Sequence, residues 1–175
     1  MSEPRSLYLK IKTSKENLQS FFSEKPIAPQ IDQDWTSWWD SRKMHSKSPL
    51  TKVPIYAWLK TNRGLADSYL SDPQTGTRER ETDQGEWQLA IAFLSHNYTE
   101  ILPMLAWVKS IATYLEAGDE GIAIIYDHFW GSGSVMAHLE FAGQQASFRL
   151  TNKTSEIDPN IIAEAGNMLM NAIGQ

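Results

Sequence analysis

The segment Asp127–Ser134, with the sequence DHFWGSGS, places a carboxylate, an imidazole and two hydroxyls within one short stretch of chain. Side chains of these types perform nucleophilic and acid–base catalysis when a fold brings them within hydrogen-bonding reach. The spacing does not match the G-x-S-x-G nucleophile elbow, because glycines flank Ser132 directly. The dinucleotide pattern G-x-G-x-x-G also fails, since Met136 stands where it needs a glycine. We therefore expect a connecting loop, and we keep a small hydrolase-like enzyme that uses this loop with His138 as an alternative.

A metal site is the second kind of chemistry to consider, because His138 and Glu140 lie two residues apart on one predicted strand face and His128 precedes them. Zinc deaminases use such an H-x-E element, but they also need a P-C-x-x-C partner, and this chain has no cysteine. His45 and His96 have no histidine four residues away, which excludes H-E-x-x-H. We expect no metal, no cofactor and no catalytic residue, and we interpret His138 and Glu140 as part of a polar outer face.

Three tryptophans, Trp35, Trp38 and Trp39, follow the spacing i, i+3, i+4. This spacing places all three rings on one face of a helical turn. The interpretation that we favour is a stripe that packs into the core, because aromatic stripes on helices usually face inward. The alternative is that part of the cluster lines a groove or an interface, where tryptophan is enriched among the residues that dominate binding.

Charge is divided unequally along the chain. Residues 1–63 carry 11 Lys and Arg against 6 Asp and Glu, a net charge of +5, whereas residues 64–175 carry 5 against 15, a net charge of −10. The two parts either neutralise each other in the fold or leave an acidic surface, which would attract basic proteins and repel phosphate backbones. A nucleic-acid adaptor would have to use the basic part, with the tryptophan face as a stacking platform. Its cations would be Lys10, Lys12, Lys15, Arg42, Lys43 and Lys47.

Length and composition indicate one globular domain. The 175 residues are 41% hydrophobic, and a chain of 19.9 kDa buries roughly 70% of its unfolded surface, enough for one core. We therefore expect residues 1–175 to form a single domain. No apolar run approaches the roughly 20 residues that span a bilayer, and the first 25 residues lack the order of a signal peptide. The expectation is a cytoplasmic protein with no membrane contact and, without cysteine, no disulfide.

Short alternating or β-branched apolar stretches predict five strands. The stretch Ile55–Lys60 fits either a strand or a helical turn, and we prefer a strand. Residues 71–85 combine turn formers with dense mixed charge, which predicts a loop or an extended hairpin tip. The five clear stretches are residues 6–13, 87–94, 122–126, 135–141 and 146–150.

Helical spacing is present near the N-terminus and more strongly in the second half. Thr13 and Glu16 form a capping box that opens a short helix, which must stop before Pro26. Asp34 can cap the turn that carries the three tryptophans.

Two longer helices are predicted further along. One begins between Thr99 and Pro103 and ends at Gly118, and the other covers residues 159–174. A strand, a helix and a strand, followed by a hairpin and a closing helix, imply an α+β domain. Its sheet should be mixed or mostly antiparallel, with the helices packed on one face.

Three segments give the chain a family resemblance: SLYLKIKT leading directly into a short helix, DWTSWWDS, and DHFWGSGS. A compact, acidic, tryptophan-rich and cysteine-free α+β domain with such segments resembles the immunity proteins of bacterial polymorphic-toxin and contact-dependent growth inhibition systems. The resemblance implies a cytoplasmic bacterial antitoxin that binds a cognate protein toxin. Such a protein neutralises the toxin by covering its active site or substrate groove.

The predicted binding residues follow from the acidic second part and its aromatic residues. Carboxylates attract the arginines of a basic partner such as a nuclease toxin, and an exposed indole supplies an anchor that becomes buried on binding. Attraction between opposite charges would also speed association with the toxin. The residues expected to contact the partner are Asp119, Glu120, Asp127, Trp130 and Glu140.

Overall fold

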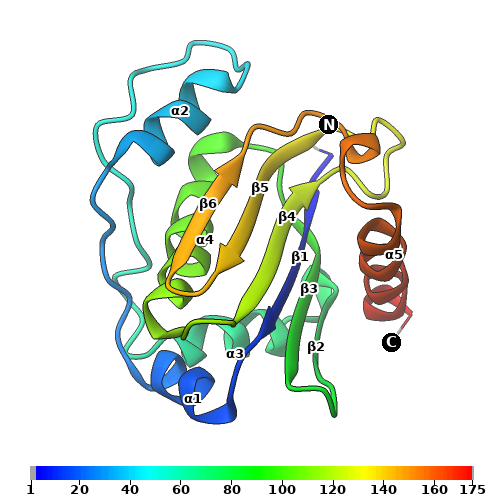
Figure 1. The fold of residues 1–175 in the computed structure, drawn as a ribbon. Helices are drawn as coiled ribbons and strands as arrows, with labels where there is room; N and C mark the ends of the chain where they lie inside the picture. Colours follow the sequence, from blue (N-terminus) through cyan, green and yellow to red (C-terminus); the bar gives the residue numbers. More distant parts are fainter. Residues whose placement is uncertain (1–2, 175) are drawn as a thin grey trace.

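The computed structural model describes residues 3–174, in which a six-stranded sheet carries helices on both faces (Figure 1). The strands are β1 (Arg5–Lys12), β2 (Thr77–Glu81), β3 (Glu86–Ser95), β4 (Glu120–Tyr126), β5 (Val135–Ala142) and β6 (Gln145–Arg149). Their order in the sheet is β2-β3-β1-β4-β5-β6, and every neighbouring pair is antiparallel. The N-terminal strand β1 therefore lies inside the sheet, between β3 and β4.

The helices are distributed over the two faces of the sheet. They are α1 (Lys15–Ser23), α2 (Gln33–Ser41), α3 (Arg63–Ser71), α4 (Tyr98–Ser110) and α5 (Pro159–Ile173), with 3₁₀ turns at Pro73–Thr75, Ile111–Tyr114 and Thr154–Glu156. Leu9 of β1 and Trp107 of α4 belong to the larger apolar core, which also includes residues of α1, α2 and α3. Tyr8 of β1 and Ala165 of α5 belong to a smaller core on the opposite face.

The expected α+β class is confirmed, and the sheet is antiparallel throughout. The expectation that the helices share one face holds for α1 to α4 and is corrected for α5. The cause lies in β1, where Leu7 and Leu9 point to one core and Tyr8 to the other, all without exposed surface. A strand that is apolar on both faces needs a cover on both sides.

Three elements between residues 55 and 81 differ from the sequence-based expectation. Ile55–Lys60 contains no strand, because the N–H of Leu59 donates to the carbonyl of Tyr56 at 3.1 Å and closes a turn. Helix α3 buries only two of its residues and so lacks the wide apolar stripe that would have predicted it. Strand β2 has the sequence TRERE and forms an edge of the sheet, where charged residues prevent pairing with other chains.

Both expected N-caps are displaced by one or two residues. Ser14 rather than Thr13 caps α1, since its hydroxyl accepts a hydrogen bond from the N–H of Asn17 at 3.1 Å. Asp32 rather than Asp34 caps α2 in the same way. The side chains of Thr13 and Asp34 are therefore free to make contacts with segments far away in the sequence.

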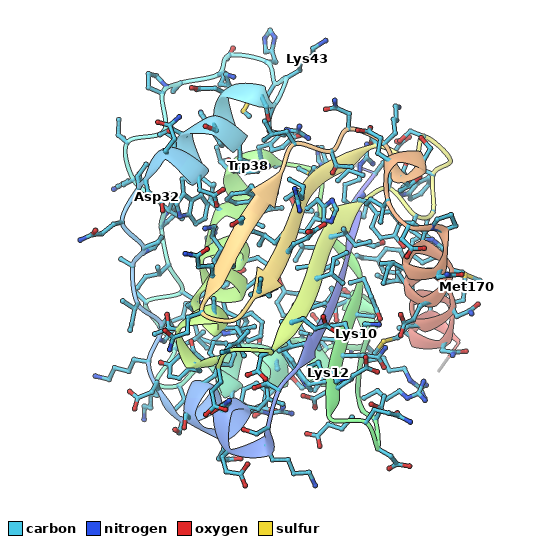
Figure 2. All side chains as sticks on the ribbon, viewed as in Figure 1. Lys10, Lys12, Asp32, Trp38, Lys43 and Met170 are labelled. Carbon is cyan, nitrogen blue, oxygen red and sulfur yellow. The ribbon has the colours of Figure 1, made fainter. Side chains whose placement is uncertain are left out.

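The three tryptophans of α2 are part of the core, as the favoured interpretation predicts. Trp35, Trp38 and Trp39 are 1%, 0% and 4% exposed. Trp38 points from α2 toward the sheet (Figure 2), where its ring stacks on Phe148 at a centroid distance of 4.7 Å and its N–H donates to the carbonyl of Met136 at 3.0 Å. These rings cannot serve as a stacking platform for nucleic acid, because no ring face is open to solvent.

The outer edge of β6 is closed by two side chains. The carboxylate of Asp34 accepts a hydrogen bond from the N–H of Phe148 at 3.1 Å, and Lys109 donates to the carbonyl of Ala146 at 2.9 Å. Asp34 and Lys109 also pair with each other at 2.9 Å. Backbone groups that would otherwise recruit a further strand are thereby occupied.

Replacing Asp34 by alanine is expected to lower the free energy of unfolding by about 1–2 kcal/mol, because the N–H of Phe148 and the ammonium of Lys109 lose their partner. The exposed edge should also promote association at high protein concentration. Urea unfolding and size-exclusion chromatography measure the two effects. Asp40→Ala, at an exposed position of the same helix, is the control and should leave both unchanged. Equal stability and elution of Asp34→Ala and the wild type would contradict the assigned role.

Candidate partner-binding surface

Helix α5 covers only one part of its face of the sheet. It packs against β1, β2 and β3, and no helix within residues 3–174 covers the corresponding side of β5 and β6 (Figure 1). The segment that leads into α5 closes one end of this area, since Ile157 is buried in the same core as Ile124 and Val135. The other end of these strands faces solvent. We call this solvent-facing part of the sheet the open face.

The antiparallel register arranges the open face in cross-strand rows. Lys12 of β1 lies opposite Glu86 of β3 on one side and Glu120 of β4 on the other. In the next row, Ile122 of β4 lies opposite Glu140 of β5. The rows thus combine carboxylates with a cation and an apolar side chain. The open face comprises Lys10, Lys12, Glu120, Ile122, Glu140 and Ser147.

A groove of about 300 Å³ borders the open face. Ile122 of the sheet and Ile161 of α5 line it with apolar surface, while Glu120 and Glu140 contribute carboxylates. Figure 2 labels Lys10 on β1, which also lines this groove. A second, more open depression follows the turns at the ends of β4 and β5 and shares Glu120 with the first. The surface is therefore concave, carries carboxylates beside lysines and is partly apolar, which suits a protein contact.

The two lysines of β1 differ in what holds them. Lys10 donates to Glu164 of α5 at 2.8 Å, and the same carboxylate accepts a hydrogen bond from Gln88 at 3.0 Å. Gln88 also donates to the hydroxyl of Tyr8 at 2.9 Å, and burial of that hydroxyl raises the pKa of Tyr8 well above its ordinary value. Lys10 is thus part of an internal polar network. Lys12 is exposed and makes no ion pair within residues 3–174, so its ammonium is available to a partner.

Glu140 is placed by its neighbours on β5 and β6. Arg149 donates to one carboxylate oxygen at 2.9 Å, and the other oxygen lies 3.7 Å from Nε2 of His138. Nδ1 of His138 hydrogen-bonds with the hydroxyl of Thr151 at 2.7 Å. Burial lowers the pKa of His138, the carboxylate of Glu140 acts in the opposite direction, and Arg149 reinforces the lowering. His138 is therefore neutral at pH 7, and the cation that pairs with Glu140 is Arg149.

The expected contact residues fall into two groups. Glu120 and Glu140 line the same groove of the open face, where they lie diagonal to each other on adjacent strands. Asp119 lies beside them but points inward, because its carboxylate accepts hydrogen bonds from the hydroxyl of Thr13 at 2.6 Å and from the N–H of Glu116 at 2.8 Å. The contact role of these residues stays a prediction, which the geometry favours for the two glutamates.

Asp127 and Trp130 lie at the opposite end of β4, in the loop that follows it. Asp127 is 3% exposed, and its carboxylate accepts hydrogen bonds from the N–H groups of Trp130 and Ser132, each at 2.8 Å, and from the hydroxyl of Ser132. Burial acts to raise the pKa of Asp127, but these hydrogen bonds outweigh it and hold the pKa below its ordinary value. The carboxylate organises the loop, and the loop presents Trp130, which is 47% exposed.

The stability of this loop should depend on pH. Because the folded pKa of Asp127 is lowered, its carboxylate stabilises the fold above the unfolded pKa of about 3.9, and the effect is lost as the pH falls through the folded value. Asp127→Asn should therefore be less stable than the wild type by about 1–2 kcal/mol at neutral pH, with the difference shrinking below about pH 4. Urea unfolding over a pH series measures it. Asp83→Asn at an exposed turn is the control, and a difference that is independent of pH would contradict this role.

The hydrolase-like alternative is not favoured by the geometry of the same loop. Ser132 hydrogen-bonds to Asp127 and lies 3.0 Å from the hydroxyl of Ser134, whereas the ring of His128 packs against those of Tyr126 and Phe129. His138 bonds to Thr151 as described above. Among the described residues, the hydrogen bonds of Ser132 include none to an imidazole, and no three His, Asp or Glu side chains form a metal-binding group.

Sequence reasoning missed Lys12, Ile122 and Ile161 as parts of the candidate surface. The alternation in β1 indicated that Lys10 and Lys12 share a face, which was the available signal. The partners of that face could not be read from the sequence, because they depend on which strands flank β1 and on where α5 docks.

Comparison of the chain with models of protein families, with curated proteins and with solved structures found no match. Within residues 3–174, no helix combines the length and the apolar character needed to cross a membrane. The functional argument therefore depends on the candidate surface itself.

Proposed function

We propose that this chain is a protein-binding inhibitor of the immunity type, which neutralises a cognate protein toxin by covering its active site or substrate groove. The observation that carries the proposal is the open face, where Glu120 and Glu140 flank Ile122 beside a groove. The partner expected for such a surface presents arginine or lysine side chains around an apolar contact, as a basic nuclease does.

The chemistry of the open face supports both speed and specificity. Carboxylates form strong hydrogen bonds with guanidinium groups, and their attraction for a basic partner accelerates the encounter. Ile122 and Ile161 supply apolar area at the centre, where water is excluded on binding. Lys12 repels any partner cation that would be placed against it. It thereby disfavours complexes in which the partner is shifted along the open face. A stable inhibitor complex buries about 800 Å² on each protein, so the contact would extend beyond the groove itself.

The test measures binding to, and protection from, a candidate toxin, for which the product of a neighbouring gene is the first choice. Wild-type protein should bind it in calorimetry and restore growth when both are expressed, and affinity should fall as salt is raised. The double variant Glu120→Lys/Glu140→Lys should bind about 100-fold more weakly and fail to protect.

The matched control is Glu81→Lys/Asp83→Lys, which makes the same change of charge at the β2–β3 hairpin, at the far edge of the sheet. It should bind within about threefold of the wild type. No complex with the wild type, or binding that is indifferent to salt, would overturn the proposal.

A further inference from the structure

Residues 43–60 connect α2 with the approach to α3 without forming a helix or a strand, and they carry the most exposed indole of the described chain. We call this segment the basic strap. It runs down the left side of the view in Figure 1. Irregular segments longer than about 15 residues in a compact domain are commonly functional or disordered. The contacts that hold the strap in place decide whether it is ordered or disordered.

The strap is held by hydrogen bonds in both directions between it and α2, and by side chains that it buries. The indole N–H of Trp39 donates to the carbonyl of Ser48 at 2.8 Å, and Lys47 donates to three carbonyls at the end of α2. Val53 and Leu59 are buried at 6% and 7% exposure. The strap is therefore an ordered surface whose shape exists before any partner arrives, which reduces the entropic cost of binding.

Trp58 projects from a turn of this ordered segment. It is 65% exposed, whereas five of the seven tryptophans are at most 4% exposed and Trp130 is 47% exposed. The turn is closed by the hydrogen bond from the N–H of Leu59 to the carbonyl of Tyr56, and the ring of Tyr56 lies edge-on to the indole at 6.3 Å. Tryptophan is enriched among the residues that dominate binding at protein interfaces, and a rigid backbone that already holds it in solvent lowers the cost of binding.

The charges around Trp58 have one sign. Residues 41–66 contain six Lys and Arg and no Asp or Glu. Arg42, Lys47 and Arg63 are engaged by hydrogen bonds within the protein. The remaining cations are exposed and form no ion pair within residues 3–174; they are Lys43, Lys52 and Lys60.

We infer that the basic strap is a second contact surface for the toxin, and that the toxin presents there an apolar pocket ringed by carboxylates, which receives Trp58. The inference rests on the proposed function, since it assigns a further contact to the same partner. Two observations favour an acidic protein surface over a nucleic acid. The strap exposes a single indole rather than a row of stacking rings, and the chain as a whole carries a net charge of −5, which repels a long phosphate backbone.

Two surfaces of different charge composition determine how the partner is oriented. The carboxylates of the open face attract a basic region, whereas the strap offers only cations and attracts an acidic one. A partner bound the other way round would bring its basic region against the cations of the strap. The strap therefore adds selectivity among toxins that share a basic active site. A toxin without the acidic pocket should bind the open face only, and more weakly.

The experiment is calorimetry with the same toxin at constant salt. Trp58→Ala should weaken binding by about 30-fold, and Trp58→Phe, which keeps a ring, by less. Lys52→Glu/Lys60→Glu should weaken it by about 10-fold and make the remaining affinity less sensitive to salt. All three positions are exposed, so the melting temperature of each variant should equal that of the wild type.

The matched controls change equally exposed groups elsewhere. Met170→Ala alters an apolar side chain of α5 that is 53% exposed (Figure 2), and Lys15→Glu/Lys25→Glu reverses two exposed charges outside the strap. Both should bind within about threefold of the wild type. If the wild type binds and the strap variants bind equally well, the strap inference is overturned while the proposed function stands. If the wild type does not bind, both are overturned.

Discussion

Replacing Arg42 by methionine is expected to lower the free energy of unfolding by about 3–5 kcal/mol, because it removes a buried donor from several acceptors at once. Arg42 is 4% exposed and follows the last turn of α2. One guanidinium nitrogen donates to the carbonyls of Val135 at 3.0 Å and Thr151 at 2.8 Å, and another to the side chain of Asn152 at 3.1 Å. These acceptors lie at the ends of β5 and β6, so Arg42 joins α2 to the sheet.

Urea unfolding followed by circular dichroism measures the loss. Arg42→Lys should be intermediate, since an ammonium keeps the charge but cannot reproduce the fork of the guanidinium. Lys43→Met is the matched control at the neighbouring exposed position and should change the stability by less than about 0.5 kcal/mol. A loss below about 1 kcal/mol for Arg42→Met would show that the junction is not held in this way.

Replacing Gly121 by alanine is expected to cost about 3 kcal/mol, because β1 and β4 leave no room for a side chain at this position. A Cβ on Gly121 would lie 2.6 Å from the carbonyl oxygen of Lys10 and 2.6 Å from Cδ1 of Ile11. The carbonyl is backbone of an interior strand that pairs on both sides, so it cannot move without disturbing the sheet. Since Glu120 and Ile122 flank this glycine, the open face should be distorted as well.

Gly64→Ala is the matched control for this substitution. A Cβ there would meet Cδ2 of Leu59 at 3.2 Å, the end of a flexible side chain, and alanine favours the helix α3. Gly64→Ala should therefore be neutral or slightly stabilising, whereas Gly121→Ala should melt earlier and bind the toxin less tightly. Equal melting temperatures for Gly121→Ala and the wild type would contradict the close approach of β1 and β4.

Strong local periodicity made much of the fold predictable. The hairpin of β5 and β6 and the helix α5 lie within a few residues of their expected positions, because their apolar residues follow one period without interruption. Helix α4 begins at Tyr98, one residue before the expected interval. Elements near the middle of the chain were missed where tertiary contacts replace that signal, as in α3, which has a narrow apolar face, and β2, which has none.

The candidate surface was less accessible from the sequence than the fold. The alternation of β5 showed that His138 and Glu140 share a face, but the position of Glu120 beside Glu140 depends on the register between two strands. That register includes an irregularity between Ile125 and Tyr126, which no sequence pattern announces. The sequence also did not predict that Trp58 is exposed, because the apolar residues around it favoured a strand.

The position of β1 in the sheet has a consequence for how the protein is made. Strand β1 hydrogen-bonds in the sheet to β3 and β4, so one of its edges stays unpaired until β3, which ends at Ser95, has been synthesised, and the other until β4, which ends at Tyr126. Pairing over such sequence separations is slow, and an apolar strand that waits for its neighbours is prone to aggregate. The yield of the protein in the cell should depend on chaperones that shield Leu7 to Ile11 during that interval.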